Sequence, residues 1–142
     1  MIKSAAGPRI AIIAADFHQD IAEVMIKAAE DTLKSEGARL LPTVRVPGAY
    51  EIPLQAELLL AKRKVDALVV VGFIERGETL HGEVMGHVVH ANLIDIQRKY
   101  RKPIGIGLIG PGATVEQAHV RKEAAARGAA AAVVKAHALV RS

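Results

Sequence analysis

The stretch from Gly72 to Val84, GFIERGETLHGEV, places glycines, charged residues, a threonine and a histidine directly after an apolar run. Backbone N–H groups around Gly77 and the hydroxyl of Thr79 would lie at a helix start, where the helix dipole favours a phosphate. His81 falls in the first turn, where the dipole disfavours imidazolium and favours a ring that can accept a proton. The turn therefore indicates a phosphate site beside a proton-transfer histidine, although ordinary helix capping explains the same residue types.

A second glycine-rich turn, GPGAT, begins at Gly110 and has the same two interpretations. It is not a Walker sequence, because no lysine follows the glycines. Arg121 lies about two turns further on, and its neighbours three and four residues away carry no charge. It is therefore either a solvated arginine or the partner of an anionic ligand.

Two aromatic residues, Phe17 and Tyr50, could stack on a planar ring. Glu51 and Gln55 could hydrogen-bond a polyol or the edge of that ring. Packing and helix-start roles are the alternatives for all four.

A possible zinc site comprises Glu83, His87 and His90, which share one helical face at spacings of i, i+4 and i+7. At about 100° per residue this face points away from His81, so the four residues cannot form one site. A polar stripe at an interface is the commoner role for such residues.

Four apolar segments alternate with four helical patterns, with no linker between them. The expected strands are Arg9–Ala15, about Arg39–Val46, Ala67–Phe73 and Pro103–Ile109. The expected helices begin at Asp20 as N-cap, at about Pro53, at roughly Leu80 and at Thr114, whose capping box uses Gln117, and they end near Gly37, Arg63, Tyr100 and Val140.

This alternation predicts the α/β class: three α/β/α layers around a four-stranded parallel sheet, flavodoxin-like, with strand order 2-1-3-4. Ligands of such sheets bind beyond the carboxyl ends of the strands. The segments after the expected strands carry the glycines, aromatic residues and polar groups described above. One site at this edge of the sheet is the expectation.

With 142 residues, the chain is expected to form a single domain over residues 1–142. It has no cysteine, which excludes disulfides, thiolate metal sites and cysteine nucleophiles, and a cytoplasmic protein is expected. No apolar run approaches the ~18 residues that span a membrane. The net charge of +4, without a basic stripe or stacking platforms, argues against nucleic acid and fits small anionic substrates.

Subunit contacts are expected, because hydrophobic residues make up 51% of the chain. In the third expected helix, apolar side chains between Val84 and Ile96 fall almost all round the helix, which predicts burial on all sides. The last helix carries many alanines, which allow another helix to approach closely. A homo-oligomer is expected, with a compact monomer as the alternative.

Four motifs follow one another in the sequence: ADFHQDI, VPGAYEIPL, GETLH and GPGATVEQAHVR. On these motifs the chain resembles lumazine synthase, 6,7-dimethyl-8-ribityllumazine synthase, from about Arg9 to the C-terminus, and it looks most like archaeal-type members. The resemblance implies a cofactor-free, metal-free transferase of riboflavin biosynthesis. It would condense 5-amino-6-(D-ribitylamino)uracil with 3,4-dihydroxy-2-butanone 4-phosphate, releasing phosphate and water.

The resemblance also implies a pentamer, or a larger assembly up to an icosahedral one, with sites between subunits. His81 would shuttle protons and Arg121 would grip the phosphate from the neighbouring subunit. Phe17 would stack on the pyrimidine. The other implied substrate-binding residues are Ala49, Tyr50, Glu51, Phe73, Ile74, Gly77, Glu78, Thr79, Ile106 and Arg127.

The chain departs from the family pattern at several positions. His18 stands where the family usually has asparagine, Gly82 replaces an aromatic residue, and Ile106 stands where many members use phenylalanine. Arg127 is the best substitute for the lysine and glutamate often found near the site.

Three other functions compete with this interpretation. Archaeal-type riboflavin synthase is a relative with the same fold, but its members lack the GETxH motif. A non-catalytic ligand-binding or shell-forming homologue is the second, and a zinc-binding module on Glu83, His87 and His90 is the third.

Overall fold

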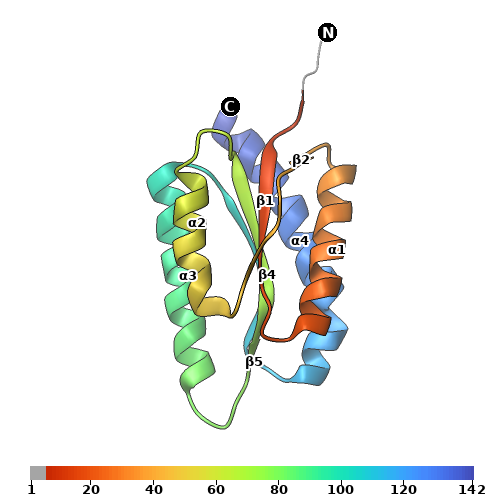
Figure 1. Cartoon of the computed structure of the whole chain (residues 1–142), viewed down its shortest axis with the longest axis vertical. Helices are drawn as coiled ribbons and strands as arrows, with labels where there is room; N and C mark the ends of the chain where they lie inside the picture. Colours follow the sequence, from red (N-terminus) through yellow and green to blue (C-terminus); the bar gives the residue numbers. More distant parts are fainter. Residues whose placement is uncertain (1–5) are drawn as a thin grey trace.

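A computed structural model describes residues 6–142 as a parallel sheet covered by two helices on each face (Figure 1). Helices α2 and α3 lie on one face, and α1 and α4 lie on the other. In chain order the elements are β1 Arg9–Ala15, α1 Gln19–Ser35, β2 Arg39–Leu40, β3 Val44–Val46, the 3₁₀ helix η1 Ala49–Glu51, α2 Ile52–Leu60, β4 Ala67–Glu75, α3 His81–Tyr100, β5 Ile104–Ala113 and α4 Val115–Arg141.

The strand order is β2-β1-β4-β5, and β3 pairs with β1 beyond the end of β2. All pairs are parallel; Ile12 lies opposite Val69, and Val69 lies opposite Gly105. The α/β class and the predicted order are therefore confirmed. The single second strand is wrong in one respect: it is split into β2 and β3 around Pro42, which has no N–H to donate to a ladder.

Two apolar layers form the core, one on each side of the sheet. Successive residues of β4 alternate between them: Val69 and Val71 face α1 and α4, whereas Leu68 and Val70 face α2 and α3. Within residues 6–142 no polar or charged side chain is fully buried. The chemistry of the chain is therefore confined to its surface and its strand ends.

Glycines bring α4 unusually close to β5. A Cβ atom on Gly105 would lie 2.3 Å from the carbonyl oxygen of Ala129, and one on Gly107 would lie 3.1 Å from the Cβ of Ala129. Only a strand without side chains on this face can approach the alanine-rich helix to such a distance. The backbones of β5 and α4 thus pack with almost no side chain between them.

Local signals place most helix ends correctly. Thr114 and Gln117 form the predicted capping box: the Thr114 hydroxyl accepts from the Gln117 N–H at 3.2 Å, and the Gln117 side chain accepts from the Thr114 N–H at 2.9 Å. Gly37, with φ of 86°, follows the end of α1 as predicted. Asp20 as N-cap is wrong, because the N-cap of α1 is His18, two residues earlier, and the helix begins at Gln19.

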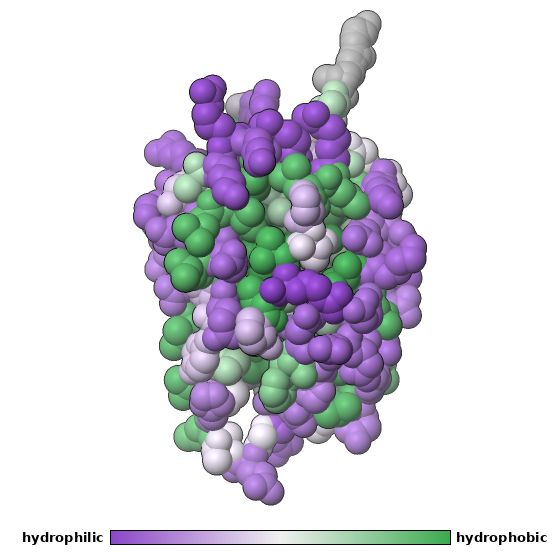
Figure 2. Space-filling model, in the orientation of Figure 1, coloured by the Kyte–Doolittle hydropathy of each residue, from purple (hydrophilic) through white to green (hydrophobic). Residues whose placement is uncertain are grey.

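Helix α3 does not bury its whole circumference in the single chain. Val89 and Leu93 are buried against the sheet, whereas Val84 and Val88 are 52% and 45% exposed. Leu54 of α2 is also exposed. Figure 2 shows such hydrophobic side chains reaching the surface among hydrophilic ones, including the side formed by α2 and α3. Among the described helices, none is long and apolar enough to cross a bilayer.

Candidate functional site

The carboxyl ends of the strands meet at one edge of the sheet, the lower end in Figure 1. A cavity of about 410 Å³ lies there. Its walls come from the loop after β1, the segment before η1, the turn after β4 and the start of α3. It is lined by Phe17, Gly48, Ala49, Phe73, Ile74, Glu75, Gly77, Thr79, His81, Gly82 and Met85.

His81 is the first residue of α3, and its ring lies next to that of Tyr50 in η1. The centroids of the two rings are 5.7 Å apart and the ring planes are nearly perpendicular, at 77°. The Thr79 hydroxyl accepts a hydrogen bond from the His81 backbone N–H at 3.3 Å. Leu80 is the N-cap residue of α3, and its side chain makes no capping hydrogen bond. The positive end of the helix thus opens onto the turn that was predicted to hold a phosphate.

The opposite wall is aromatic. Phe17 is 68% exposed, so its ring can stack against a planar ligand. The centroid of the His18 ring lies 4.9 Å from that of Phe17, in a T-shaped arrangement, and 5.0 Å from that of Phe73. The Nε2 atom of His18 hydrogen-bonds Oε1 of Glu75 at 2.9 Å. Four lining residues have no role predicted from the sequence: Gly48, Glu75, Gly82 and Met85. Of these four, Glu75 carries a charge, and it belongs to the charged turn after β4.

The loop that carries Phe17 is also held by an ion-pair cluster. Arg45 of β3 donates to the Asp16 carboxylate at 2.9 Å and pairs with Glu23 of α1. The hydrogen bond with Asp16, followed by that with Glu23, raises the pKa of Arg45 above its ordinary value. Asp16 itself follows β1 directly, so this cluster ties β1, β3 and α1 together next to Phe17.

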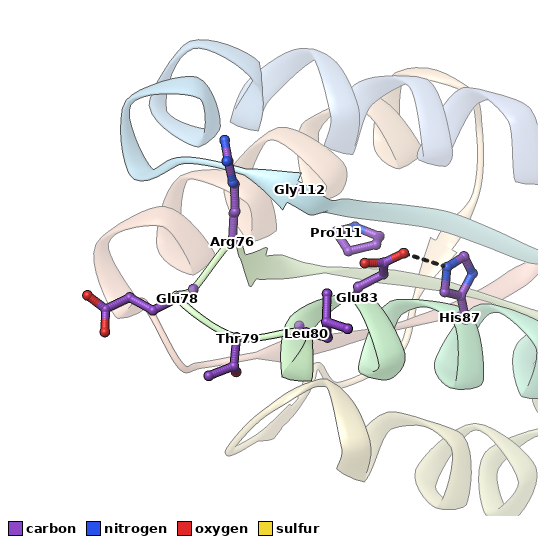
Figure 3. Close-up of a pocket in the computed structure, with 10 residues that line it drawn as sticks. Arg76, Glu78, Thr79, Leu80, Glu83, His87, Pro111 and Gly112 are labelled. Carbon is purple, nitrogen blue, oxygen red and sulfur yellow. Dashed lines mark ion pairs between the residues drawn. The ribbon is translucent and has the colours of Figure 1, made fainter.

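A second cavity of about 620 Å³ adjoins the first and shares Gly77, Thr79 and Gly82 with it (Figure 3). Its other lining residues are Arg76, Glu78, Leu80, Glu83, His87, Pro111 and Gly112.

The three residues of the possible zinc site have other arrangements. Nε2 of His87 lies 3.7 Å from the Glu83 carboxylate (Figure 3), and Nδ1 of His90 donates to the Gly86 carbonyl at 2.7 Å. Over the described part of the chain, no three histidine or carboxylate side chains gather as metal ligands would.

Arg121 does not reach the first cavity within one chain. It lines a third hollow of about 370 Å³ with Gln117, and this hollow shares Pro111 and Gly112 with the second one. The three hollows therefore follow one another around the carboxyl edge, from the His81 side of the sheet to the α4 side. Arg127 lies farther off, between α1 and α4, and donates to Glu123 at 2.7 Å.

The predicted substrate-binding residues thus divide into two groups. The first cavity brings together most of them, and Tyr50 contacts it through His81. Glu78 lines the second cavity instead, and Ile106 packs against the core on the α2–α3 side. Glu51 ends η1, beside Gly48. The predicted site residues that do not line the first cavity in one chain are Tyr50, Glu51, Glu78, Ile106, Arg121 and Arg127.

Residues 7–141 match the family model described as 6,7-dimethyl-8-ribityllumazine synthase. A relative of that name from Pyrobaculum arsenaticum is 40% identical over 127 residues, which cover 89% of this chain and 85% of the relative. Relatives of the same name from Staphylothermus marinus and Saccharolobus islandicus are 39% and 35% identical, over 89% of this chain and 85% and 82% of their own lengths.

Proposed function

Because this chain belongs to the 6,7-dimethyl-8-ribityllumazine synthase family, we propose that it condenses 5-amino-6-(D-ribitylamino)uracil with 3,4-dihydroxy-2-butanone 4-phosphate. The products are 6,7-dimethyl-8-ribityllumazine, phosphate and water, and the reaction belongs to riboflavin biosynthesis. The observation that carries this function is the first cavity, which joins the exposed ring of Phe17, the glycine turn before α3 and His81. The same match favours condensation over the dismutation of a riboflavin synthase.

Each substrate has a suitable part of the site. The pyrimidine stacks on Phe17, with Phe73 and Ile74 as apolar neighbours. Tyr50, with Ala49 and Glu51, holds the ribityl chain and the edge of the ring. The turn formed by Gly77, Glu78 and Thr79 holds the phosphate, because its backbone N–H groups lie at the positive end of α3.

The chemistry needs no group beyond the substrates and these side chains. The uracil amine attacks the ketone carbon, and water leaves as the Schiff base forms. Elimination of phosphate then leaves a carbonyl on the neighbouring carbon. The ribitylamino nitrogen attacks this carbonyl, and a second water leaves as the ring closes. His81 carries protons between these steps, and the closed site holds the two reactants together, which can supply a large share of the rate.

The site becomes complete between subunits of a homopentamer or a larger, icosahedral assembly. In this assembly Arg121 of a neighbouring subunit binds the phosphate, and Arg127 of that subunit lies near the site. Two features support this assembly: the exposed apolar side chains Val84 and Val88 of α3, and the position of Arg121 on the other side of the sheet. The cysteine-free chain suits the reducing cytoplasm.

The test is to mix the purified, assembled protein with both substrates and to follow lumazine absorbance and fluorescence. A blank without protein is required, because the substrates also condense slowly on their own. Formation of lumazine faster than in the blank supports the proposal. A rate equal to the blank from a correctly assembled oligomer would contradict it and favour a non-catalytic ligand-binding or shell protein.

A further inference from the structure

The cavity wall behind Phe17 contains a contact that the proposed roles do not use. Glu75, the last residue of β4, and His18, the N-cap of α1, are 57 residues apart in sequence and 2.9 Å apart between Oε1 and Nε2. A carboxylate oxygen accepts, so Nε2 of His18 donates. The Glu75 side chain is 37% exposed and the His18 side chain is 25% exposed, so water competes only partly with this hydrogen bond.

His18 joins this carboxylate to the aromatic wall. The centroid of its ring lies 4.9 Å from that of Phe17, with the two rings nearly perpendicular, and 5.0 Å from that of Phe73. Phe17, Phe73 and Glu75 all line the first cavity, whereas His18 does not. The imidazole is therefore a support behind the wall, and Glu75 fixes its orientation.

Phe17 needs such a support. Its ring is 68% exposed and sits on a loop between β1 and α1, where an unsupported side chain would sample several rotamers. A stacking platform binds best when its rotamer is already fixed, because ordering a side chain on binding reduces affinity. The edge of His18 limits the positions that the Phe17 ring can adopt.

We propose that His18 and Glu75 are positioning residues that hold Phe17 in the orientation in which it stacks on the pyrimidine substrate. This inference rests on the proposed function, in which Phe17 is the platform. It also explains two residue types together. Histidine stands at position 18 where the family usually has asparagine, and at position 75 this chain supplies the carboxylate that orients it.

The inference makes a substrate-specific prediction. Loss of the contact between His18 and Glu75 should weaken binding of 5-amino-6-(D-ribitylamino)uracil. It should leave binding of the butanone phosphate, whose proposed place is near Gly77 and Thr79, almost unchanged. We expect His18→Ala and Glu75→Ala each to raise the Kd and KM for the ribitylaminouracil about 5- to 10-fold, which is within the range for ordering one side chain on binding. The KM for the butanone phosphate should change less than about 2-fold.

Coupling between the two residues separates positioning from two independent losses. Because the residues act through one contact, the double variant His18→Ala/Glu75→Ala should bind the ribitylaminouracil no more weakly than either single variant. His18→Gln keeps an N–H donor and should recover part of the affinity. In a Phe17→Ala background, His18→Ala should have no further effect.

The experiment is an equilibrium titration of the assembled full chain with the ribitylaminouracil, beside steady-state assays in which each substrate is varied in turn. Asp20→Asn is the matched control, because Asp20 forms a comparable contact with His119, at 3.6 Å, away from the cavity lining. This control should bind and turn over as the unchanged protein does. Unfolding temperature and assembly size are measured for every variant.

The outcomes separate the two proposals. If the unchanged protein makes lumazine but Glu75→Ala and His18→Ala leave ribitylaminouracil binding as it was, the positioning inference is wrong and the proposed function stands. Equal increases in both KM values would also contradict the inference. If the unchanged protein neither binds the ribitylaminouracil nor makes lumazine, the proposed function fails and the inference fails with it.

Discussion

His81 and Arg121 lie on opposite faces of the same sheet. His81 begins α3, which packs with α2 on one face, and Arg121 lies in α4, which packs with α1 on the other. The hollow that Arg121 lines is separated from the His81 cavity by a further one around the edge of the sheet. If both residues serve one reaction, they serve it from two different subunits.

Complementation between subunits tests this arrangement. His81→Ala and Arg121→Ala oligomers should each have little activity, and co-assembly of the two chains should restore part of it. With random mixing at equal amounts in a ring, about one quarter of the sites would combine an intact His81 with an intact Arg121. The measurement is lumazine formation after joint refolding. No gain in activity in mixed oligomers of verified composition would contradict a site shared between two subunits.

Removing the imidazole should slow the chemical step. His81→Ala should lower kcat about 10- to 10,000-fold, the range for a lost proton-transfer group, with a smaller effect on the KM values. Steady-state assays with both substrates measure this. His119→Ala, which removes an exposed histidine of α4 outside the first cavity, is the control. An unchanged kcat in His81→Ala would contradict the proton-transfer role of His81.

Gly82 should resist replacement. A Cβ atom at this position would lie 2.6 Å from the carbonyl oxygen of Glu75, which is backbone and cannot turn aside. Gly82→Ala should therefore destabilise the protein by about 1–3 kcal/mol, and an aromatic residue should be worse. Thermal or urea unfolding measures the change.

Gly128 provides the matched control for that substitution. It lies inside α4 with no atom within 4 Å of the position of an added Cβ. Gly128→Ala should leave stability unchanged or raise it by about 0.5–1 kcal/mol through helix propensity. Equal effects of the two substitutions would show that the contact with Glu75 does not constrain position 82.

An ion pair at the opposite end of β1 should make stability depend on pH. The Asp66 carboxylate accepts from the Arg9 backbone N–H at 2.7 Å and from its Nε at 3.0 Å. The side-chain hydrogen bond from Arg9 is the main cause that lowers the pKa of Asp66 below its ordinary value. A carboxylate with a lowered pKa in the folded state stabilises the fold above its unfolded pKa, and this contribution is lost as pH falls through the folded pKa.

Asp66→Asn should therefore lower the free energy of unfolding by about 1 kcal/mol near neutral pH. The difference from the unchanged protein should begin to shrink below about pH 4, where Asp66 of the unfolded chain takes up a proton, and it should vanish only below the lowered pKa of Asp66 in the folded state. Urea unfolding at pH 7, 5 and 3 measures this. Asp95→Asn, in a highly exposed pair 4.0 Å from Arg98, is the control and should change little. A difference as large at pH 3 as at pH 7 would contradict the assignment.

The fold was predictable because its signals are local. Unbroken apolar runs marked β1, β4 and β5, and Thr114 with Gln117 marked the start of α4. The break between β2 and β3 was missed, although Pro42 gave a signal for it. The continuation of β5 to Ala113 was missed because GPGA resembles a turn, yet β5 still pairs with β4 there, Glu75 opposite Ala113.

The site was only partly predictable, because some of its contacts join distant positions. Phe17, Gly77, Thr79 and His81 were recognised as strand-end residues, and the cavity brings them together. The contact between His18 and Glu75 has no sequence signal, since neither residue type nor spacing predicts a pair 57 residues apart. The sequence showed that the third helix is too apolar for one buried face, but hydropathy alone did not indicate that Val84 and Val88 are the residues that one chain leaves exposed.

The close packing of β5 on α4 has a consequence for how the enzyme can vary. With Gly105 and Gly107 against Ala129, the two elements have no deformable layer of side chains between them. A larger residue in β5 cannot be absorbed by repacking, so it must push α4 outward as a rigid rod. Arg121 belongs to α4 and would move with the helix. In the proposed assembly, a mutation in β5 of one subunit would therefore weaken the contact between Arg121 and the phosphate bound in the next subunit's site.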